Sequence, residues 1–143
     1  MAEHESVRVT KDLIALLNAH DIEGYLKHID PGYTGESENA GVVHGHDGVR
    51  QMLGSMFVAF PDFHVEVEQV IASGDHVVGC AILSGTNTGS FAGMAPTNRK
   101  ASWHACNVSE LRNGKVIRNR IYADNVSLMR QLGVLPVPKA TSA

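Results

Sequence analysis

The sequence predicts an α+β domain, because helical periodicity fills its first part and strand periodicity its second. Apolar residues recur at helical spacing as far as Phe60, and from Phe63 onward they alternate with polar residues. Pro61 separates the two patterns, since the residue before a proline is pushed out of the helical conformation. Helices that precede an antiparallel sheet predict a curved sheet that wraps over the N-terminal helices and encloses a pocket at its open end.

Length and composition limit the possible classes of protein. The chain has 143 residues, which suits one domain spanning 1–143, and we expect the tail from about residue 134 to be mobile. A net charge of -3 without a cluster of cations argues against nucleic acid as a partner. The chain also lacks the long apolar run of a membrane helix and the pattern of a signal peptide. These features predict a cytoplasmic protein that does not bind a membrane.

Three helices are predicted in the first part. Apolar positions define the first over Val9–Leu17, and the second follows the N-cap candidate Asp21 over Ile22–Ile29. The segment Gly35–Gly41 has the composition of a polar loop. A third apolar stripe then covers Val49–Phe60.

Strand signals dominate the second part. Ser73-Gly74-Asp75 and Asn113-Gly114 are typical of turns, and the second of these is a strong hairpin signal. Cys80 and Cys106 fall in apolar stretches without a metal-type spacing, which predicts two reduced core residues. The expected elements are strands over Phe63–Glu68, Val77–Leu83, Ala101–Leu111 and Val116–Asp124, followed by a helix over Val126–Leu132.

The register of the last hairpin stays open between two solutions. A two-residue turn at Asn113-Gly114 would place Trp103 opposite Asp124. A three-residue loop with Gly114 in a bulge would instead place His104 opposite Tyr122 and Ser102 opposite Asp124. In both registers, side chains that alternate with a period of two share the face of Asp124. They are those of Val116, Arg118, Arg120 and Tyr122.

Four short motifs resemble those of a known family in order and spacing. They are Ala59-Phe60-Pro61-Asp62, then Ser84-Gly85-Thr86, then Asn113-Gly114-Lys115-Val116, and finally Asp124 with Gln131-Leu132-Gly133. From about Leu13 to Leu135 the chain resembles the SnoaL-like polyketide cyclases of the nuclear-transport-factor-2-like superfamily. The resemblance implies a cone-shaped α+β fold, a homodimer or homotetramer, and an apolar pocket for a small, polyketide-like organic substrate.

The resemblance also implies an activity and a role for Asp124. Family members of this kind close a ring by an aldol reaction without a cofactor, and the aspartate matching Asp124 is the general acid/base. Aldol closure needs a base to remove a carbon-bound proton and an acid to protonate the new alkoxide, which one carboxyl group can do in turn. Asp124 is alternatively the N-cap of the following helix, unless Asn125 supplies that cap.

Further side chains are candidates for the site. Tyr122 and Arg120 could donate hydrogen bonds to a substrate oxygen, although the arginines could instead lie at the pocket mouth or at a subunit interface. His104 either assists Asp124 as a second catalytic group or is a core histidine. We expect Trp103, Met56, Phe57 and Tyr25 to bind the substrate, although Met56 and Phe57 at helical spacing could instead be core residues. No metal ligand set is predicted, because His44 and His46 lack accompanying ligands at a recognised spacing.

Two classes of function follow from these residues. The first is a cofactor-independent, cyclase- or isomerase-type lyase, with an epoxide hydrolase as another enzyme of this superfamily. The second is a non-catalytic module that binds a small molecule, in which Asp124 would be taken up by capping hydrogen bonds. Apolar residues on both faces of Val77–Leu83 and Ile117–Ala123 further predict a homodimer, since two apolar faces need two partners.

Overall fold

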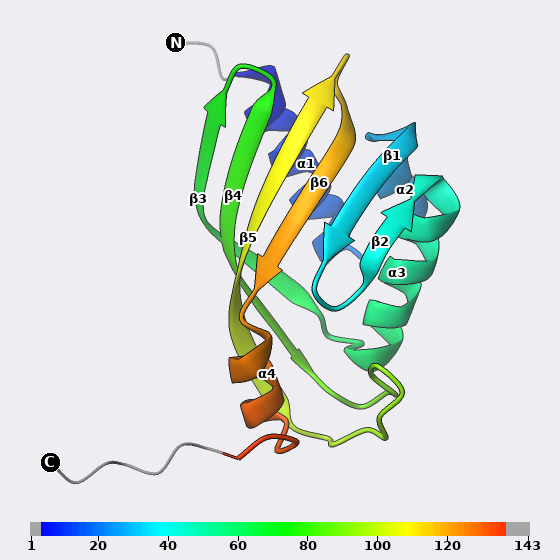
Figure 1. Ribbon diagram of the computed structural model, residues 1–143, viewed down its shortest axis with the longest axis vertical. Coiled ribbons are helices and arrows are strands. Elements are labelled where there is room, and N and C mark those ends of the chain that lie inside the picture. The colour runs from blue at the N-terminus through cyan, green and yellow to red at the C-terminus, as the bar shows by residue number, and fades with distance from the viewer. Residues whose placement is uncertain (1–3, 137–143) are drawn as a thin grey trace, which may run out of the picture.

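A computed structural model describes residues 4–136 and confirms the α+β class. Three helices precede most of the sheet: α1 (Glu5–Asn18), α2 (Ile22–Leu26) and α3 (Gly45–Ala59). α1 crosses behind the sheet, and α3 runs along its β1 and β2 side (Figure 1). Among residues 4–136, no helix is long and apolar enough to cross a membrane.

Six strands form one open, curved sheet. They are β1 (Ile29–Ser37), β2 (Gly41–His44), β3 (His64–Ser73), β4 (His76–Thr86), β5 (Lys100–Arg112) and β6 (Lys115–Ala123). Their order across the sheet is β2-β1-β6-β5-β4-β3. All neighbouring pairs are antiparallel except β1 with β6, which are parallel. A short helix, α4 (Asn125–Gln131), continues from β6 and confirms the expected C-terminal helix to within a residue.

The first hairpin was missed by the sequence prediction. Ile29 begins β1 rather than ending a helix, and the expected loop over 35–41 contains the end of β1 and the start of β2. Local propensity is weak here because Pro31 and two glycines interrupt the strand. Pairing with β6 stabilises the extended conformation, and it buries Ile29 and Tyr33 in the core. The tertiary partner therefore overrides the local signal.

A bulge in β6 decides which side chains face the helices. Arg112 pairs with Lys115, as a two-residue turn requires, but Glu110 pairs with Arg118, so Ile117 is an extra residue. Both expected registers are therefore wrong beyond the bulge. His104 comes opposite Asp124, whose backbone N–H donates to the His104 carbonyl at 2.9 Å.

The bulge also separates residues that were predicted to share one face. On its far side, the inward-facing residues of β6 are Asn119, Ile121 and Ala123, which line the interior. Arg118, Arg120 and Tyr122 point to the outer face instead. A shift of one residue exchanges the two faces of a strand, because side chains alternate with a period of two.

Asp62 ties the end of α3 to the end of β4. Its carboxylate accepts hydrogen bonds from the Thr86 backbone N–H at 2.6 Å and from the Thr86 hydroxyl at 2.8 Å. These bonds, the backbone one first, hold the pKa of Asp62 below its ordinary value of 3.8. A carboxyl group with a depressed folded-state pKa stabilises the fold above its unfolded-state pKa, and loses that contribution as the pH falls through the folded-state pKa.

We therefore expect Asp62→Ala to lower the free energy of unfolding by about 1 kcal/mol at pH 7, since the group is exposed. The difference from the parent protein should shrink as the pH is lowered below about 3.8. Thermal unfolding followed by circular dichroism at pH 7 and pH 3 measures both. Asp47→Ala is the control, because within residues 4–136 the fully exposed Asp47 carboxylate bonds only to Arg50 on its own helix. An equal loss at both pH values would contradict the assigned role of the Asp62 carboxylate.

Candidate functional site

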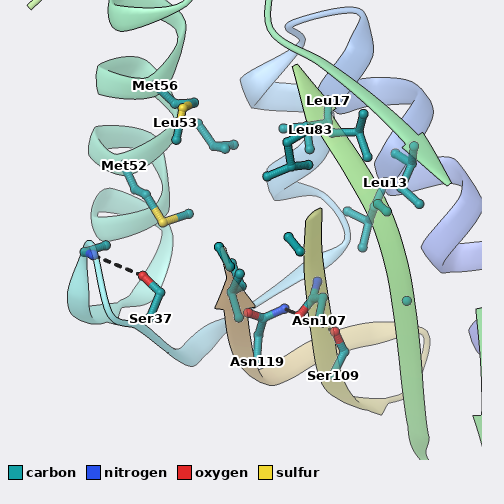
Figure 2. A pocket seen from close by; sticks show the side chains of 18 of the residues that line it. Leu13, Leu17, Ser37, Met52, Leu53, Met56, Leu83, Asn107, Ser109 and Asn119 are labelled. Carbon is teal, nitrogen blue, oxygen red and sulfur yellow. Dashed lines mark hydrogen bonds between the residues drawn. The ribbon is translucent and has the colours of Figure 1, made fainter. Parts of the chain in front are cut away.

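An apolar cavity of about 220 Å³ lies between the helices and the inner face of the sheet. Leu13 and Leu17 of α1 approach it from one side, and Met52, Leu53 and Met56 of α3 from another (Figure 2). Pockets for drug-sized ligands usually measure about 300–1,000 Å³. This cavity therefore suits a small, largely apolar organic molecule.

A polar cluster interrupts the apolar wall on the sheet side. Asn119 on β6 lies directly opposite Ser109 on β5, and Asn107 is two residues before Ser109 on the same face. The Asn119 amide nitrogen donates to the Asn107 carbonyl oxygen and, at 3.1 Å, to the Ser109 hydroxyl oxygen. All three side chains face the cavity (Figure 2). We call these three residues the amide cluster.

The amide cluster is buried at a cost. Asn119 is 6% exposed and Ser109 is 8% exposed. Within residues 4–136, the Asn119 carbonyl oxygen has no hydrogen-bond partner. An unsatisfied buried acceptor destabilises a fold by about 1–3 kcal/mol. Apolar side chains would fill this wall more cheaply, so the cluster is a candidate for ligand recognition.

Two tyrosines add hydroxyl groups to the same cavity. Burial raises the pKa of Tyr25 to about 12. Burial, together with the neighbouring Tyr25, also raises the pKa of Tyr33. Both phenols therefore keep their protons at neutral pH, and they can act toward a ligand as neutral hydrogen-bond donors.

Helix α4 and the turn between β1 and β2 meet at one edge of the cavity. Leu128 of α4 is buried and lines the cavity, as does Asn125 at the start of the helix. The Asn39 amide nitrogen donates to the Asn125 side-chain oxygen at 2.7 Å and joins the two segments. The position of α4 therefore helps to determine how closed the cavity is.

Asp124 lies outside the cavity, which corrects the expectation that it is buried beside it. Its side chain is exposed and caps α4 by accepting a hydrogen bond from the Ser127 N–H at 3.0 Å. Asn125 does not replace it as the cap and faces the cavity instead. Aspartate is a preferred N-cap, and the β6 bulge turns this position away from the interior.

Three other expected site residues also lie on the outer face. Tyr122 is 49% exposed, and the Arg120 guanidinium lies 5.4 Å from the centre of its ring. Arg120 also donates to Glu36 at 2.9 Å. The His104 side chain is 71% exposed and lies 3.7 Å from Glu68. The predictions that place these side chains at the substrate are therefore wrong for this structure, because all three alternate with the inward-facing positions of their strands.

Three of the four residues expected to make apolar contacts lie in the cavity wall. Trp103, Met56 and Tyr25 line the cavity. Phe57 does not, since the helical period turns it toward His20, on which its ring stacks with the centroids 4.0 Å apart. His46, one of the two histidines weighed as a metal ligand, bonds to the Ile29 carbonyl through its Nε2 atom at 2.7 Å.

The amide cluster and Asn125 were missed by sequence reasoning. A signal for part of the cluster was present, because Trp103, Asn107 and Ser109 share one face of a strand that alternates with a period of two. Two polar residues on the face of a buried tryptophan are unusual in a core strand. Asn119 carried no such signal, since the bulge that turns it inward is not visible in the sequence.

The chain belongs to the SnoaL-like polyketide cyclase family, whose model matches residues 7–132. No protein of curated function matches its sequence at a significant level. Among solved structures, it is similar to AclR from Streptomyces galilaeus, a provisionally assigned hydroxylase. The two are 30% identical, with a TM-score of 0.83 over 94% of this chain and 85% of AclR.

Two further structures have a similar fold. IdmH from Streptomyces antibioticus, a provisionally assigned polyketide cyclase, is 26% identical, with a TM-score of 0.80 over 92% of this chain and all of IdmH. A SnoaL-like protein from Jannaschia sp. CCS1 is 23% identical, with a TM-score of 0.85 over 95% of this chain and 99% of that protein, and it supports the fold alone. The family, together with AclR and IdmH, supports a role of the cyclase or hydroxylase kind.

Proposed function

We propose that this protein is a cofactor-independent cyclase that closes a ring in a small polyketide-like substrate by an aldol reaction. The observation that carries the proposal is an apolar cavity whose wall holds the buried amide cluster. Apolar walls hold a flexible chain in a folded shape, and fixed donors stabilise charge on its carbonyl oxygens.

The charges around the cavity support an uncharged substrate. Among the described residues that line it, none is a lysine, arginine or histidine, and the only acidic one is Glu38 in the turn between β1 and β2. Burial of an anionic ligand without a cation would be costly. A neutral chain of ketone and enol groups fits these surroundings better.

In the proposed reaction, a base removes a proton from the carbon next to a carbonyl group, and the enolate carbon then bonds to a second carbonyl carbon. The resulting alkoxide takes up a proton, so the product has the mass of the substrate. We propose Asp124 as the acid/base because it matches the general acid/base of the SnoaL-like family, although its carboxylate lies outside the cavity in this structure. To act, the Asp124 carboxylate must release its hydrogen bond from the Ser127 N–H and turn into the cavity, where it can take up the substrate proton.

The second candidate function is a non-catalytic module that binds a small molecule in the same cavity. The exposed, capping position of Asp124 favours it, since a carboxylate engaged by a backbone N–H does not reach the ligand. Epoxide hydrolysis would need two carboxylates bridged by an arginine, but Arg120 bonds to Glu36 on the outer face. That reaction is therefore not supported by this arrangement.

Product analysis tests the proposed activity. Incubation with synthetic aromatic chains that carry two or three ketone groups should yield a product of unchanged mass, with one carbonyl lost and one hydroxyl gained. Turnover should be the same after dialysis against EDTA and with no nicotinamide or flavin added. Tight binding of these compounds without any conversion would favour the binding module.

We also propose that the outer face of the sheet pairs with a second copy of the chain. Side chains on this face of β4 and β5 form a strip that the monomer leaves half-exposed. The thiols of Cys80 and Cys106 lie in this strip, 3.9 Å apart. Both cysteines are only half-buried, so the prediction that they are core residues is wrong. The strip consists of Val78, Cys80, Ile82, Cys106 and Val108.

Sedimentation velocity at micromolar concentration should therefore show a particle of twice the chain mass. Val78→Glu should shift it toward the monomer, because its cross-strand neighbours Ile71 and Val108 are apolar, so a carboxylate buried there is desolvated without a partner. Val58→Glu, on the exposed side of α3 and away from the outer face of the sheet, is the matched control and should leave the dimer intact. A parent protein that sediments only as a monomer would refute the proposed pairing.

A further inference from the structure

The amide cluster has a defined direction of hydrogen bonding. Both donations within it come from the Asn119 amide nitrogen, one to Asn107 and one to Ser109. A carboxamide nitrogen has two N–H donors, so Asn119 uses both. The acceptor oxygen of Asn107 is thereby engaged, and its side chain is held in one of its two amide orientations.

Donors are left facing the cavity. Within residues 4–136, the Asn107 amide nitrogen makes no hydrogen bond, and Asn107 is half-buried in the cavity wall. The Ser109 hydroxyl oxygen accepts from Asn119, and its own proton makes no bond in the same part of the chain. Two donors on neighbouring inward-facing positions of β5 match an acceptor on the ligand.

We propose that Asn107 is a specificity-determining residue that donates to a carbonyl oxygen of the ligand, and that Asn119 is the positioning residue that orients it. Ser109 supplies a second donor next to it. This inference rests on the proposed function, because it names the group by which a polycarbonyl ligand is recognised in the same cavity. A hydrocarbon of equal shape occupies the cavity without this bond.

A matched pair of probes tests the proposal. 1-Tetralone is a bicyclic ketone, and tetralin has the same ring skeleton without the oxygen. Isothermal titration calorimetry gives both dissociation constants, and quenching of Trp103, the single tryptophan of the chain, reports entry into the cavity it lines. The ratio of the two constants isolates the oxygen contact from general changes in packing.

Asn107→Leu should weaken binding of 1-tetralone relative to tetralin by roughly five-fold, as expected for one hydrogen bond. Asn119→Leu should shift the ratio in the same direction, whereas mere loosening of the cavity would weaken both probes equally. Should Asn107→Leu fail to fold, Asn107→Ala removes the same donor without adding bulk. Thr10→Val is the control, because the Thr10 hydroxyl already donates to the Ser6 carbonyl at 2.8 Å.

The possible failures are distinguishable. An unchanged ratio in folded Asn107 variants that still bind tetralin would overturn the inference and leave the proposed function standing. Absence of binding by both probes to the parent protein would overturn the inference together with the proposed use of the cavity. A ratio that shifts equally in Thr10→Val would also refute a specific role for Asn107.

Discussion

Asp124→Asn should lower the rate of ring closure by about 100- to 10,000-fold if Asp124 transfers the proton, which is the usual contribution of general acid–base catalysis. We expect this loss without a loss of fold. Asparagine is as good an N-cap as aspartate, so its side-chain oxygen can still accept the Ser127 N–H. Turnover and thermal unfolding of the same preparation measure the two effects separately.

Asp21→Asn is a matched control for this substitution. Asp21 caps α2 as Asp124 caps α4, by accepting the Gly24 N–H at 2.9 Å, and it does not line the cavity. It should therefore leave turnover unchanged. A folded Asp124→Asn protein with undiminished turnover would remove Asp124 from the mechanism. If the parent protein binds polycarbonyl compounds but converts none of them, the non-catalytic binding module becomes the better-supported function.

Gly79→Leu should abolish ligand binding and turnover, with at least a hundred-fold loss of affinity, because it fills the cavity. Gly79 lies on the inner face of β4 and lines the cavity, and a Cβ atom built on it meets no atom within 4 Å. Its backbone does not need the left-handed conformation that favours glycine. A larger side chain can therefore enter the empty space, and strands favour it over glycine.

The fold should tolerate this substitution, so the melting temperature should hold or rise. Gly54→Leu on α3 is the control, since its Cβ position is equally open but lies outside the residues that line the cavity. That variant should keep its affinity for the ligand. Unaltered binding by a folded Gly79→Leu protein would show that the ligand occupies another part of the molecule.

The outcome for the hairpin of β5 and β6 shows where sequence reasoning reaches its limit. The turn at Asn113-Gly114 was predictable, because those residues adopt positive φ angles of 54° and 75° that few others accept. The extra residue at Ile117 was not, because a bulge depends on how the strand fits its neighbours. Without this extra residue, Arg120 would face inward as the sequence predicted. With it, Asn119 faces inward instead.

The amide cluster is the clearest case of a site that needs the fold. Its two asparagines lie 12 positions apart in the chain, and only the β5 and β6 pairing brings their side chains together. Asp124 is the opposite case, because its cap on α4 involves only the next three residues and was one of the two readings open from the sequence. Local hydrogen bonds can be predicted from local sequence, whereas contacts across strands cannot.

The sequence by itself determined the α+β class, the order of most elements, the C-terminal helix and the family, since each follows from periodicity, turn residues or short motifs. Of the residues predicted from the sequence to bind substrate, Trp103, Met56 and Tyr25 line the cavity. Tertiary structure alone decided the β1 and β2 hairpin, the β6 bulge and hence the side of the sheet on which Arg120, Tyr122 and Asp124 lie. These depend on pairing between distant segments, where a shift of one residue reverses which side chains reach the interior.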